Sequence, residues 1–400
     1  MPAAYSGFET AVENLGSRLA ARGHHVIVYC RPHMVQRRYR FYKGMRLVYL
    51  PTLATKHLDT FVHTFLSTLH MGVCARPDAA IYFIAGNSPF AGLARLFGIP
   101  SAINVDGLDS RRAKWGGPAR LYLRWAEHNA PRFATAVITD SRILQQIYRV
   151  EHHAETIFIP YGANMELAPD NAAVASGLPG EVVASPTERT PTLQRLGLKP
   201  RAFILFVGRL VPENNAHVLL EAYGHLTTAL PLVIVGDAPY SDGYIASLHH
   251  RAAQISVNGK RVIFTGYLFG EPYRELLRHC AVFAVPTEVG GTHPVLVEAM
   301  AAGACVVVND HAPNMEVIGD AGESYGGSDG APALAAAIDR LLTNPRHANS
   351  LRSKARERAG RLYSWDAVTD AYEALALSLV SHAERQAHKR DNRLPDAGGS

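Results

Sequence analysis

The sequence lacks the features of several simple protein classes. It has only four cysteines in 400 residues, and none of them forms a CxxC pair, which argues against a zinc knuckle and favours structural thiols in a reduced compartment. No stretch approaches the roughly 20 uncharged apolar residues that span a bilayer. No charged and then apolar leader follows Met1, so we expect no signal peptide and a cytoplasmic protein.

Motifs of several enzyme classes are also missing. There is no GxxxxGK[ST] loop and no GxGxxG after a first strand, which argues against a P-loop NTPase and a dinucleotide oxidoreductase. No HExxH spacing and no Asp-x-Asp pair occurs, so we expect no metal and no other cofactor. Residues 322–326 match GxSxG, but a glycine-rich segment follows where a nucleophile elbow needs a helix.

The charge balance is mild, but one segment is strongly basic. The chain has 40 Lys and Arg against 35 Asp and Glu, which is weak evidence for nucleic acid. Residues 31–46 contain six cations and no acid, with Tyr39, Phe41 and Tyr42 among them. This pattern predicts a patch for an anionic membrane surface or an acidic substrate. The alternative is a solvated loop with a few anchoring aromatic residues.

Short apolar runs alternate with helical patterns almost from end to end. Continuous apolar runs are typical of parallel strands covered on both faces, and the alternation predicts βαβ units. The predicted strands are 24–30, 45–51, 79–85, 100–106, 135–140, 155–161, 202–208, 230–236, 262–266, 281–286 and 305–310. The predicted helices include 8–22, 118–130, 214–228 and 294–302.

The alternation stops between Gly162 and Pro200, where only one short helix near 191–196 is expected. We therefore predict an α/β protein with two doubly wound, Rossmann-like domains that face a cleft, where such sheets place ligands. The predicted parts are a first domain 1–165, a linker 166–199, a second domain 200–365, a helix 366–387 and a disordered tail 388–400.

The start of the chain departs from this plan. A doubly wound domain begins with a strand in the middle of its sheet, whereas this chain opens with a loop that leads directly into a helix. We expect the first strand of the N-terminal sheet to be missing, which leaves either a slot of about 10 Å between 24–30 and 79–85 or a distorted first sheet. On this view the natural start lies upstream of Met1.

The strongest local signal for function is GGTHPVLVEAMAAG, residues 290–303. Pro294 fits the first position of a helix, with Thr292 or His293 as its cap and Gly303 as its left-handed end. The free amides and the positive end of the helix dipole suit a diphosphate.

Two more residues of this segment fit a nucleotide. Gly290 and Gly291 permit close backbone approach to a ligand. Glu298 lies about one turn inside the helix, where a carboxylate can accept hydrogen bonds from ribose hydroxyls. The alternative is a capped surface helix whose glutamate has a buried partner.

Further candidates lie at strand ends and at a helix start. Arg209 follows the strand 202–208, where a guanidinium can clamp phosphate oxygens. Asp106 ends the strand 100–106, where it suits a turn or a substrate contact. Gly7 belongs to a flexible loop, residues 5–10, that opens the first helix.

Together these segments resemble glycosyltransferase family 4, the retaining transferases of the GT-B fold, over about residues 3–380. The likeness is greatest to the bacterial rhamnosyltransferase-like branch of cell-surface polysaccharide assembly. The motifs that carry it are SGFETAVENL, NVDGLDSRRAKW, IPYGAN, VGRLVPENN, VGDAPY and VGGTHPVLVEAM. The resemblance implies a nucleotide-sugar donor bound mainly by the second domain, and an acceptor bound by the first, often as a lipid-linked sugar.

The resemblance also implies residue roles. Gly7 would lie near the donor diphosphate and the acceptor, and Asp106 would face the reacting sugar. Arg209 would hold the diphosphate, the segment Gly291–Pro294 would wrap its oxygens, and Glu298 would bind the ribose.

The sequence departs from the family pattern at two places. The first of two glutamates that lie eight positions apart in the family falls here at Gly290, and Glu288 stands two positions too early. Asn214 or Asn215 replaces the usual Lys after the arginine loop. The rhamnosyltransferase-like branch shares both features, so we still expect Gly290 and Asn214 to take part in donor binding.

We therefore expect a metal-independent, retaining glycosyltransferase, with dTDP-rhamnose as the first predicted donor and a lipid-linked or polysaccharide acceptor. The leaving phosphate can accept the proton of the acceptor while Arg209 and the amides of 291–294 stabilise the developing charge. One alternative is a non-catalytic GT-B-like partner subunit of a polysaccharide assembly complex. A nucleic-acid binder rests only on a pI of about 9.0.

Overall fold

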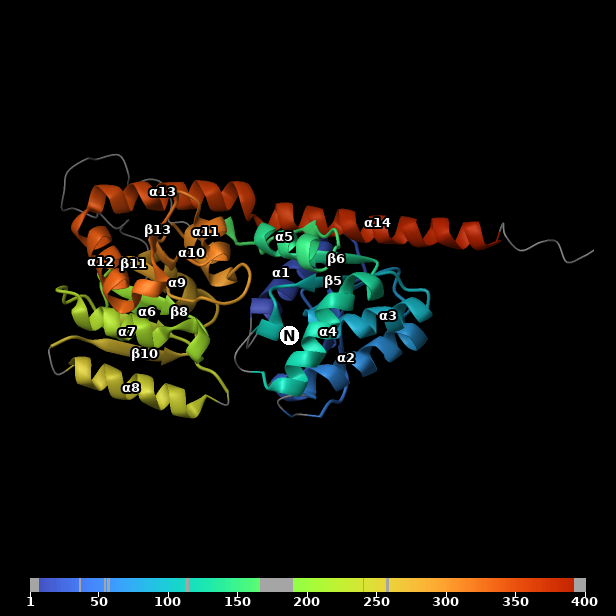
Figure 1. Ribbon diagram of the computed structural model, residues 1–400, viewed down its shortest axis with the longest axis horizontal. Helices are drawn as coiled ribbons and strands as arrows, with labels where there is room; N and C mark the ends of the chain where they lie inside the picture. The colour runs from blue at the N-terminus through green and yellow to red at the C-terminus, as the bar shows by residue number, and fades with distance from the viewer. Residues whose placement is uncertain are drawn as a thin grey trace, which may run out of the picture. The chain divides into compact units, whose positions relative to one another are not determined.

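The chain folds into two compact units (Figure 1). The computed structural model describes residues 7–35, 37–53, 55, 58–111, 115–165, 190–239, 241–256 and 259–391. Within these residues the first unit comprises the chain up to Tyr161, Gly290–Thr292 and the chain from Trp365. The second unit comprises Gly162–Val289 and His293–Ser364. Residues 166–189 of the predicted linker, residues 5 and 6 of the opening loop and residues 392–400 of the predicted tail lie outside the described chain.

The first unit contains two separate sheets. A parallel sheet has the order β4-β5-β6-β7, formed by Ala80–Phe83, Ser101–Val105, Ala136–Thr139 and Ile157–Phe158. A smaller sheet has the order β1-β3-β2, formed by Ile27–Cys30, Met45–Tyr49 and Phe41–Tyr42. Here β1 is parallel to β3, and β2 is antiparallel to it. The helices of this unit are α1 (Gly7–Ala21), α2 (Asp59–His70), α3 (Ser88–Leu96), α4 (Gly117–Phe133), α5 (Arg142–Glu151) and α14 (Trp365–Asp391).

The sheet of the first unit is split, as predicted. The strands β1 and β4 belong to different sheets, and within the described residues they do not pair. On α1, Gly16 lies against Met45 of β3, and Leu15 shares a core cluster with β5. On α2, His70 contacts Tyr29 of β1 and Thr68 is hydrogen-bonded to Tyr82 of β4. Two helices thus join the half-sheets.

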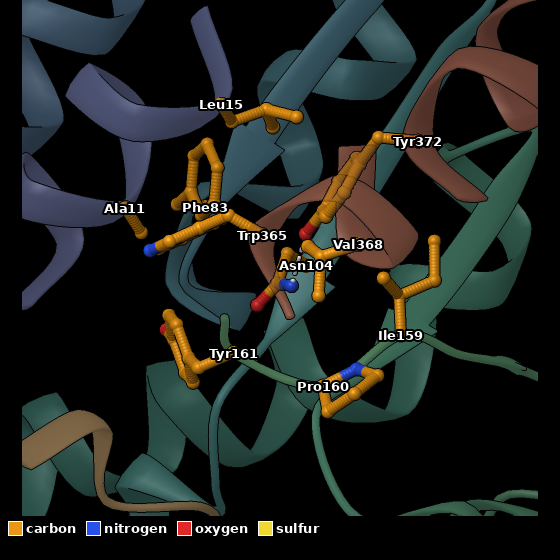
Figure 2. A pocket seen from close by; sticks show the side chains of 10 residues that line it. All are labelled: Ala11, Leu15, Phe83, Asn104, Ile159, Pro160, Tyr161, Trp365, Val368 and Tyr372. Carbon is orange, nitrogen blue, oxygen red and sulfur yellow. Dashed lines mark hydrogen bonds between the residues drawn. The ribbon is translucent and has the colours of Figure 1, made fainter. Parts of the chain in front are cut away.

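Helix α14 completes the core of the first unit. It packs on α1, and its side chains Trp365, Val368, Tyr372, Leu375 and Leu379 are buried with apolar residues of α1, β5, β6 and the chain after β7. Asn104 donates its side-chain amide to the Tyr372 hydroxyl at 2.7 Å. Figure 2 shows this pair beside a small cavity that holds about one water molecule. The cavity is too small for a sugar or a nucleotide, so it belongs to the core.

The second unit is a doubly wound domain. Its parallel sheet has the order β10-β9-β8-β11-β12-β13. The strands are, in chain order, Ile204–Val207, Leu232–Val235, Val262–Gly266, Val282–Val285, Val306–Asn309 and Glu323–Tyr325. The helices α6 to α13 are Pro191–Leu196, Ala216–His225, Asp242–Ser256, Glu271–His279, Pro294–Ala301, Ala312–Ile318, Gly330–Thr343 and Pro345–Leu362. Because successive strand residues alternate between two core clusters, both sheet faces are covered.

The element predictions were mostly right, and the differences have simple causes. Every predicted strand and the helix at 191–196 are present, whereas the short strands β2 and β13 were not predicted. Ser324 lies in β13, an edge strand, so the GxSxG match is no nucleophile elbow. The last helix continues to Asp391, so residues 388–391 of the predicted disordered tail are helical, and by its contacts α14 belongs to the first unit. In the described chain no helix has the length and apolar character needed to cross a membrane.

Candidate functional site

The candidate site lies where the strand order of the second unit reverses. From β8 the chain builds the sheet outward through β9 and β10, and from β11 it builds in the opposite direction. Open α/β sheets bind ligands at the carboxyl ends of their strands at such a point. The loops that leave β8 and β11 carry Arg209 and the segment Gly290–Pro294. Asn215 joins these loops, because its side-chain amide donates to the Pro286 carbonyl at 3.1 Å.

A hydrogen bond to its backbone carbonyl positions Arg209, and in the described chain this bond does not involve the guanidinium group. The side-chain amide of Asn214 donates to the Arg209 carbonyl at 2.8 Å. The Arg209 side chain is partly exposed, and within the described residues its guanidinium has no hydrogen bond or ion pair. A guanidinium without a carboxylate partner at a switch point is suited to an anion such as a diphosphate. Asn214 therefore fixes the position of the arginine loop.

A glycine after β9 allows the ends of β8 and β9 to approach each other closely. Gly236, which follows β9, has φ +140°, and a Cβ atom there would lie 1.9 Å from the Gly208 carbonyl oxygen. Gly208 in turn donates its amide to Val235 at 3.0 Å. Gly236 of the VGDA segment therefore permits a backbone contact that a residue with a Cβ atom could not make.

Helix α10 begins and ends as the sequence predicts. Pro294 is its first residue, His293 occupies the cap position without a side-chain cap bond, and Gly303 has φ +71°. Pro at this position leaves no amide unsatisfied, and Gly adopts the left-handed conformation without strain.

Glu298 has a hydrogen-bond partner within the protein, as the alternative interpretation of this helix expected, but the sequence did not identify that partner. The hydroxyl of Tyr273 on α9 donates to Glu298 Oε2 at 2.5 Å, and the Glu298 side chain is partly buried. Burial raises the pKa of Glu298, and the hydrogen bond from Tyr273 opposes that rise. Burial and the Glu298 carboxylate hold the pKa of Tyr273 well above its usual range, so the tyrosine remains the donor. Tyr273 thus orients the carboxylate. It lies 25 residues from Glu298 in an ordinary helical pattern, so no sequence signal marked it.

Glu288 provides a second carboxylate on the loop after β11. It is exposed, and the side-chain amide of Asn309, the last residue of β12, donates to Glu288 Oε1 at 3.3 Å. The same loop is held at Thr287, whose carbonyl accepts from the Asn314 amide at 3.0 Å. A carboxylate is therefore present two positions before Gly290, on a loop that neighbouring elements fix.

The residues Gly290–Thr292 pack within the first unit. Gly291 donates its amide to the Asp106 carbonyl at 2.9 Å, and Thr292 donates its amide to Asp140 Oδ2 at 3.0 Å. The Thr292 hydroxyl donates to the Asp140 carbonyl at 2.8 Å. A Cβ atom on Gly291 would lie 2.4 Å from Asp140 Oδ1, so glycine is required here by a contact within the protein. Asp140, at the end of a predicted strand, was not singled out from the sequence.

Hydrogen bonds to α4 also position the loop that carries Asp106. Glu127 on α4 is buried and accepts from the Ser110 amide at 2.9 Å and from the Ser110 hydroxyl at 2.6 Å. Burial raises the pKa of Glu127, and the two bonds from Ser110 oppose the rise. Gly7 is the first residue of α1. Among the described residues no three His, Cys, Asp or Glu side chains come together as ligands for a metal ion.

Comparison with known proteins assigns the chain to a family. A model of the glycosyl transferase 4-like domain matches residues 6–162, and a model of glycosyl transferases group 1 matches residues 189–358. The chain belongs to the GT-B glycosyltransferases of the family 4 type. Arg209, Glu298 and the segment Gly290–Pro294 lie in the part that matches the group 1 model.

Individual relatives of this glycosyltransferase family agree with the assignment. One is the GDP-mannose-dependent alpha-(1-6)-phosphatidylinositol monomannoside mannosyltransferase of Mycolicibacterium smegmatis, 31% identical over 195 residues, 45% of this chain and 49% of the relative. Another is the N-acetylgalactosamine-N,N'-diacetylbacillosaminyl-diphospho-undecaprenol 4-alpha-N-acetylgalactosaminyltransferase of Campylobacter jejuni, 29% identical over 191 residues, 47% of this chain and 49% of the relative. The chain thus spans about half the length of these curated relatives.

Solved structures show the same fold. Anabaena Alr3699/HepE in complex with UDP and glucose has a TM-score of 0.75 and 18% identity, and the match covers 94% of this chain and 97% of that chain.

Proposed function

We propose that this glycosyltransferase transfers a hexose, with retention of configuration, from a nucleoside diphosphate sugar to a lipid-linked or polysaccharide acceptor. The observation that carries the proposal is the Arg209 guanidinium, which has no hydrogen bond or ion pair among the described residues and lies at the strand-order reversal, where the α10 segment also begins. The leaving phosphate accepts the acceptor's proton, and Arg209 with the amides at the start of α10 stabilises the developing charge. The proposed donor-binding residues also include Gly7, Asn214, Gly290 and Glu298.

The proposal requires a change in existing hydrogen bonds at Gly291 and Thr292. In this structure the Gly291 amide donates to the Asp106 carbonyl, and the Thr292 amide donates to the Asp140 carboxylate. Donor binding through them therefore exchanges these bonds for bonds to phosphate. Asp106 is proposed to face the reacting sugar.

The nature of the acceptor is supported by the relatives. The mycobacterial relative acts on a phosphatidylinositol monomannoside and the Campylobacter relative on a diphospho-undecaprenol sugar, both of which are lipid-linked. The donor is open to direct test, with dTDP-rhamnose as our first candidate beside GDP- and UDP-sugars. A thermal-shift panel of these nucleotide sugars selects the donor, and transfer from it to a lipid-linked sugar tests the activity. Absence of both binding and turnover with every donor would favour the non-catalytic partner subunit instead.

Replacing Tyr273 with Phe is expected to raise the KM for the donor three- to tenfold and to change kcat little. The hydroxyl of Tyr273 stabilises the ionised form of Glu298. Its removal therefore raises the pKa of Glu298 further, and the acidic limb of the kcat/KM profile moves to higher pH. Steady-state kinetics over a pH series measure both effects. Tyr244→Phe is the matched control, since that hydroxyl bonds to His217. An unchanged KM and pH profile for Tyr273→Phe would remove Glu298 from donor binding.

Chelation by EDTA is expected to leave the transfer rate essentially unchanged. The sequence has no Asp-x-Asp pair, and Arg209 with the N-terminal amides of α10 is proposed to carry the diphosphate charge. The measurement is the initial rate before and after EDTA treatment. Complete loss of activity that Mg²⁺ or Mn²⁺ restores would show that a metal carries the charge instead.

We also propose peripheral attachment to an anionic membrane through residues 31–46. Arg31 is paired with Asp59 and Lys43 with Glu13, both at 2.7 Å. Arg37, Arg38 and Arg40 each lie over an aromatic ring and are exposed. Each contributes at most about 1 kcal/mol near an anionic surface. We expect Arg37/Arg38/Arg40→Glu to weaken the salt-sensitive part of binding to anionic vesicles. Equal binding by this variant would exclude the patch.

A further inference from the structure

Helices α2 and α4 of the first unit share an exposed apolar face. Phe61 and Phe65 of α2 are each 41% exposed, and Leu121 and Trp125 of α4 are 71% and 46% exposed. Each pair is four residues apart, so each pair lies on one side of its helix. These four residues define the α2–α4 face.

The face is continuous, because its aromatic rings contact one another. Phe61 and Phe65 both pack on the buried Phe90 of α3, with ring centroids 4.9 and 6.2 Å apart. Phe61 also contacts Tyr122 at 6.1 Å, and Tyr122 contacts Trp125 at 6.0 Å. The helix α3 packs against both α2 and α4 (Figure 1). The exposed apolar side chains of α2 and α4 therefore form one surface that rests on the buried Phe90 of α3, as is typical of a binding surface rather than of scattered exposed residues.

The exposed charges of helices α3 and α4 have one sign. The four arginines of α3 and α4, namely Arg95, Arg120, Arg124 and Arg132, are exposed, and in the described chain none of them forms an ion pair. Arg95 and Arg120 donate to the backbone carbonyls of Arg132 and Trp115, and Arg132 donates to Asn129 Oδ1. Glu127 is the sole acid of α3 and α4, and it is buried against Ser110. The acid of α2, Asp59, is paired with Arg31.

We propose that the α2–α4 face inserts into the head-group region of an anionic lipid bilayer. Trp and Tyr prefer this depth, Phe and Leu bury apolar area there, and unpaired arginines meet anionic phosphates. A second copy of the chain fits less well, because it would bring the arginine-rich helices against themselves. The inference deepens the membrane attachment of the proposed function and rests on it only for the choice of a bilayer as partner.

The α2–α4 face differs from the patch at residues 31–46 in how it binds. In that patch Tyr39 and Tyr42 are partly buried, so Phe41 is its exposed aromatic side chain. The patch at residues 31–46 therefore contributes to membrane binding mainly by charge, whereas the α2–α4 face contributes by inserting apolar side chains. The two contributions respond differently to salt, since apolar insertion persists when charges are screened.

The test is binding of the full chain to vesicles of phosphatidylcholine and phosphatidylglycerol, without any nucleotide sugar. We expect Leu121→Ser/Trp125→Ser to reduce the salt-resistant part of binding at least tenfold. Leu377→Ser, which removes an equally exposed apolar side chain on α14, is the matched control and should bind like the unchanged chain. Equal binding by the double variant, or no binding by the unchanged chain, would overturn the proposal.

A second measurement does not depend on the stability of the double variant. Lipids with brominated chains should quench the tryptophan fluorescence of the bound protein, and Trp125→Phe, which preserves the ring packing, should lose most of this quenching. Quenching that persists in Trp125→Phe overturns the proposal. A second result would also overturn it: the unchanged chain forms a dimer, Leu121→Ser/Trp125→Ser abolishes that dimer, and neither of the two proteins binds vesicles. The face would then be an interface between two copies of the chain. Nucleotide-sugar binding, measured separately by thermal shift, should be the same in all variants, so failure here is distinguishable from failure of the proposed activity.

Discussion

Replacing Arg209 with Ala is expected to lower turnover at least a hundredfold while the protein stays folded. The guanidinium is partly exposed at the end of β8 and has no hydrogen bond or ion pair among the described residues, so its removal breaks no internal interaction. A preorganised donor that stabilises developing charge contributes about 3 kcal/mol to the transition state. Since about 1.4 kcal/mol corresponds to a factor of ten, that loss corresponds to more than two orders of magnitude in rate.

The measurement is kcat with the selected donor, combined with a thermal melt. Arg251→Ala serves as the matched control, because Arg251 is an exposed arginine of the same unit whose ion pair with Glu221 is 3.8 Å long. Arg209→Lys should recover only part of the rate, since an ammonium group cannot clamp two phosphate oxygens in the same plane. A folded Arg209→Ala enzyme with a nearly normal rate would remove this residue from the reaction.

Replacing Gly236 with Ala is expected to destabilise the second unit by about 4 kcal/mol or more, or to prevent its folding. The new Cβ would lie 1.9 Å from the Gly208 carbonyl oxygen, which is a backbone atom, and φ is +140°. Strain in such a backbone region costs about 1–3 kcal/mol by itself. The overlap adds to that cost, because the ends of β8 and β9 must separate to relieve it. Such a separation also moves Arg209, so any folded protein should lose activity.

Urea and thermal unfolding measure this effect. Gly243→Ala is the matched control, since Gly243 lies in α8 with no atom within 4 Å of the new Cβ. Alanine is a better helix former there, so the control should be neutral or slightly stabilising. If Gly236→Ala unfolded at the same urea concentration as the unchanged protein, the close contact between the two strand ends would not exist.

Local patterns predicted most of the elements, because they depend on residues close together in the chain. The continuous apolar run at 202–208 contains β8, and the order Pro294 to Gly303 marked both ends of α10. The strands β2 and β13 escaped prediction because two or three residues at a sheet edge carry too little pattern.

Contacts between distant segments were the part that the sequence could not predict. The contact of Gly291 with Asp140 joins positions about 150 apart, and it gives the glycine a role within the protein that a ligand-based interpretation of the motif misses. The bond from Tyr273 to Glu298 joins two helices whose packing depends on the whole sheet. Local periodicity contains no information on such pairs, because tertiary packing decides them.

The position of α14 sets a constraint on protein synthesis. The first unit buries Ala11 and Ile138 together with side chains as far along the chain as Leu379, so the ribosome must translate the whole second unit before this core can close. Until then the apolar faces of α1, β5 and β6 remain exposed in the nascent chain, and such surfaces attract chaperones or aggregate. The second unit takes its own sheet and helices from a nearly continuous stretch of chain. The later-synthesised unit can therefore reach its native fold before the earlier one does, which reverses the usual N-terminal-first order.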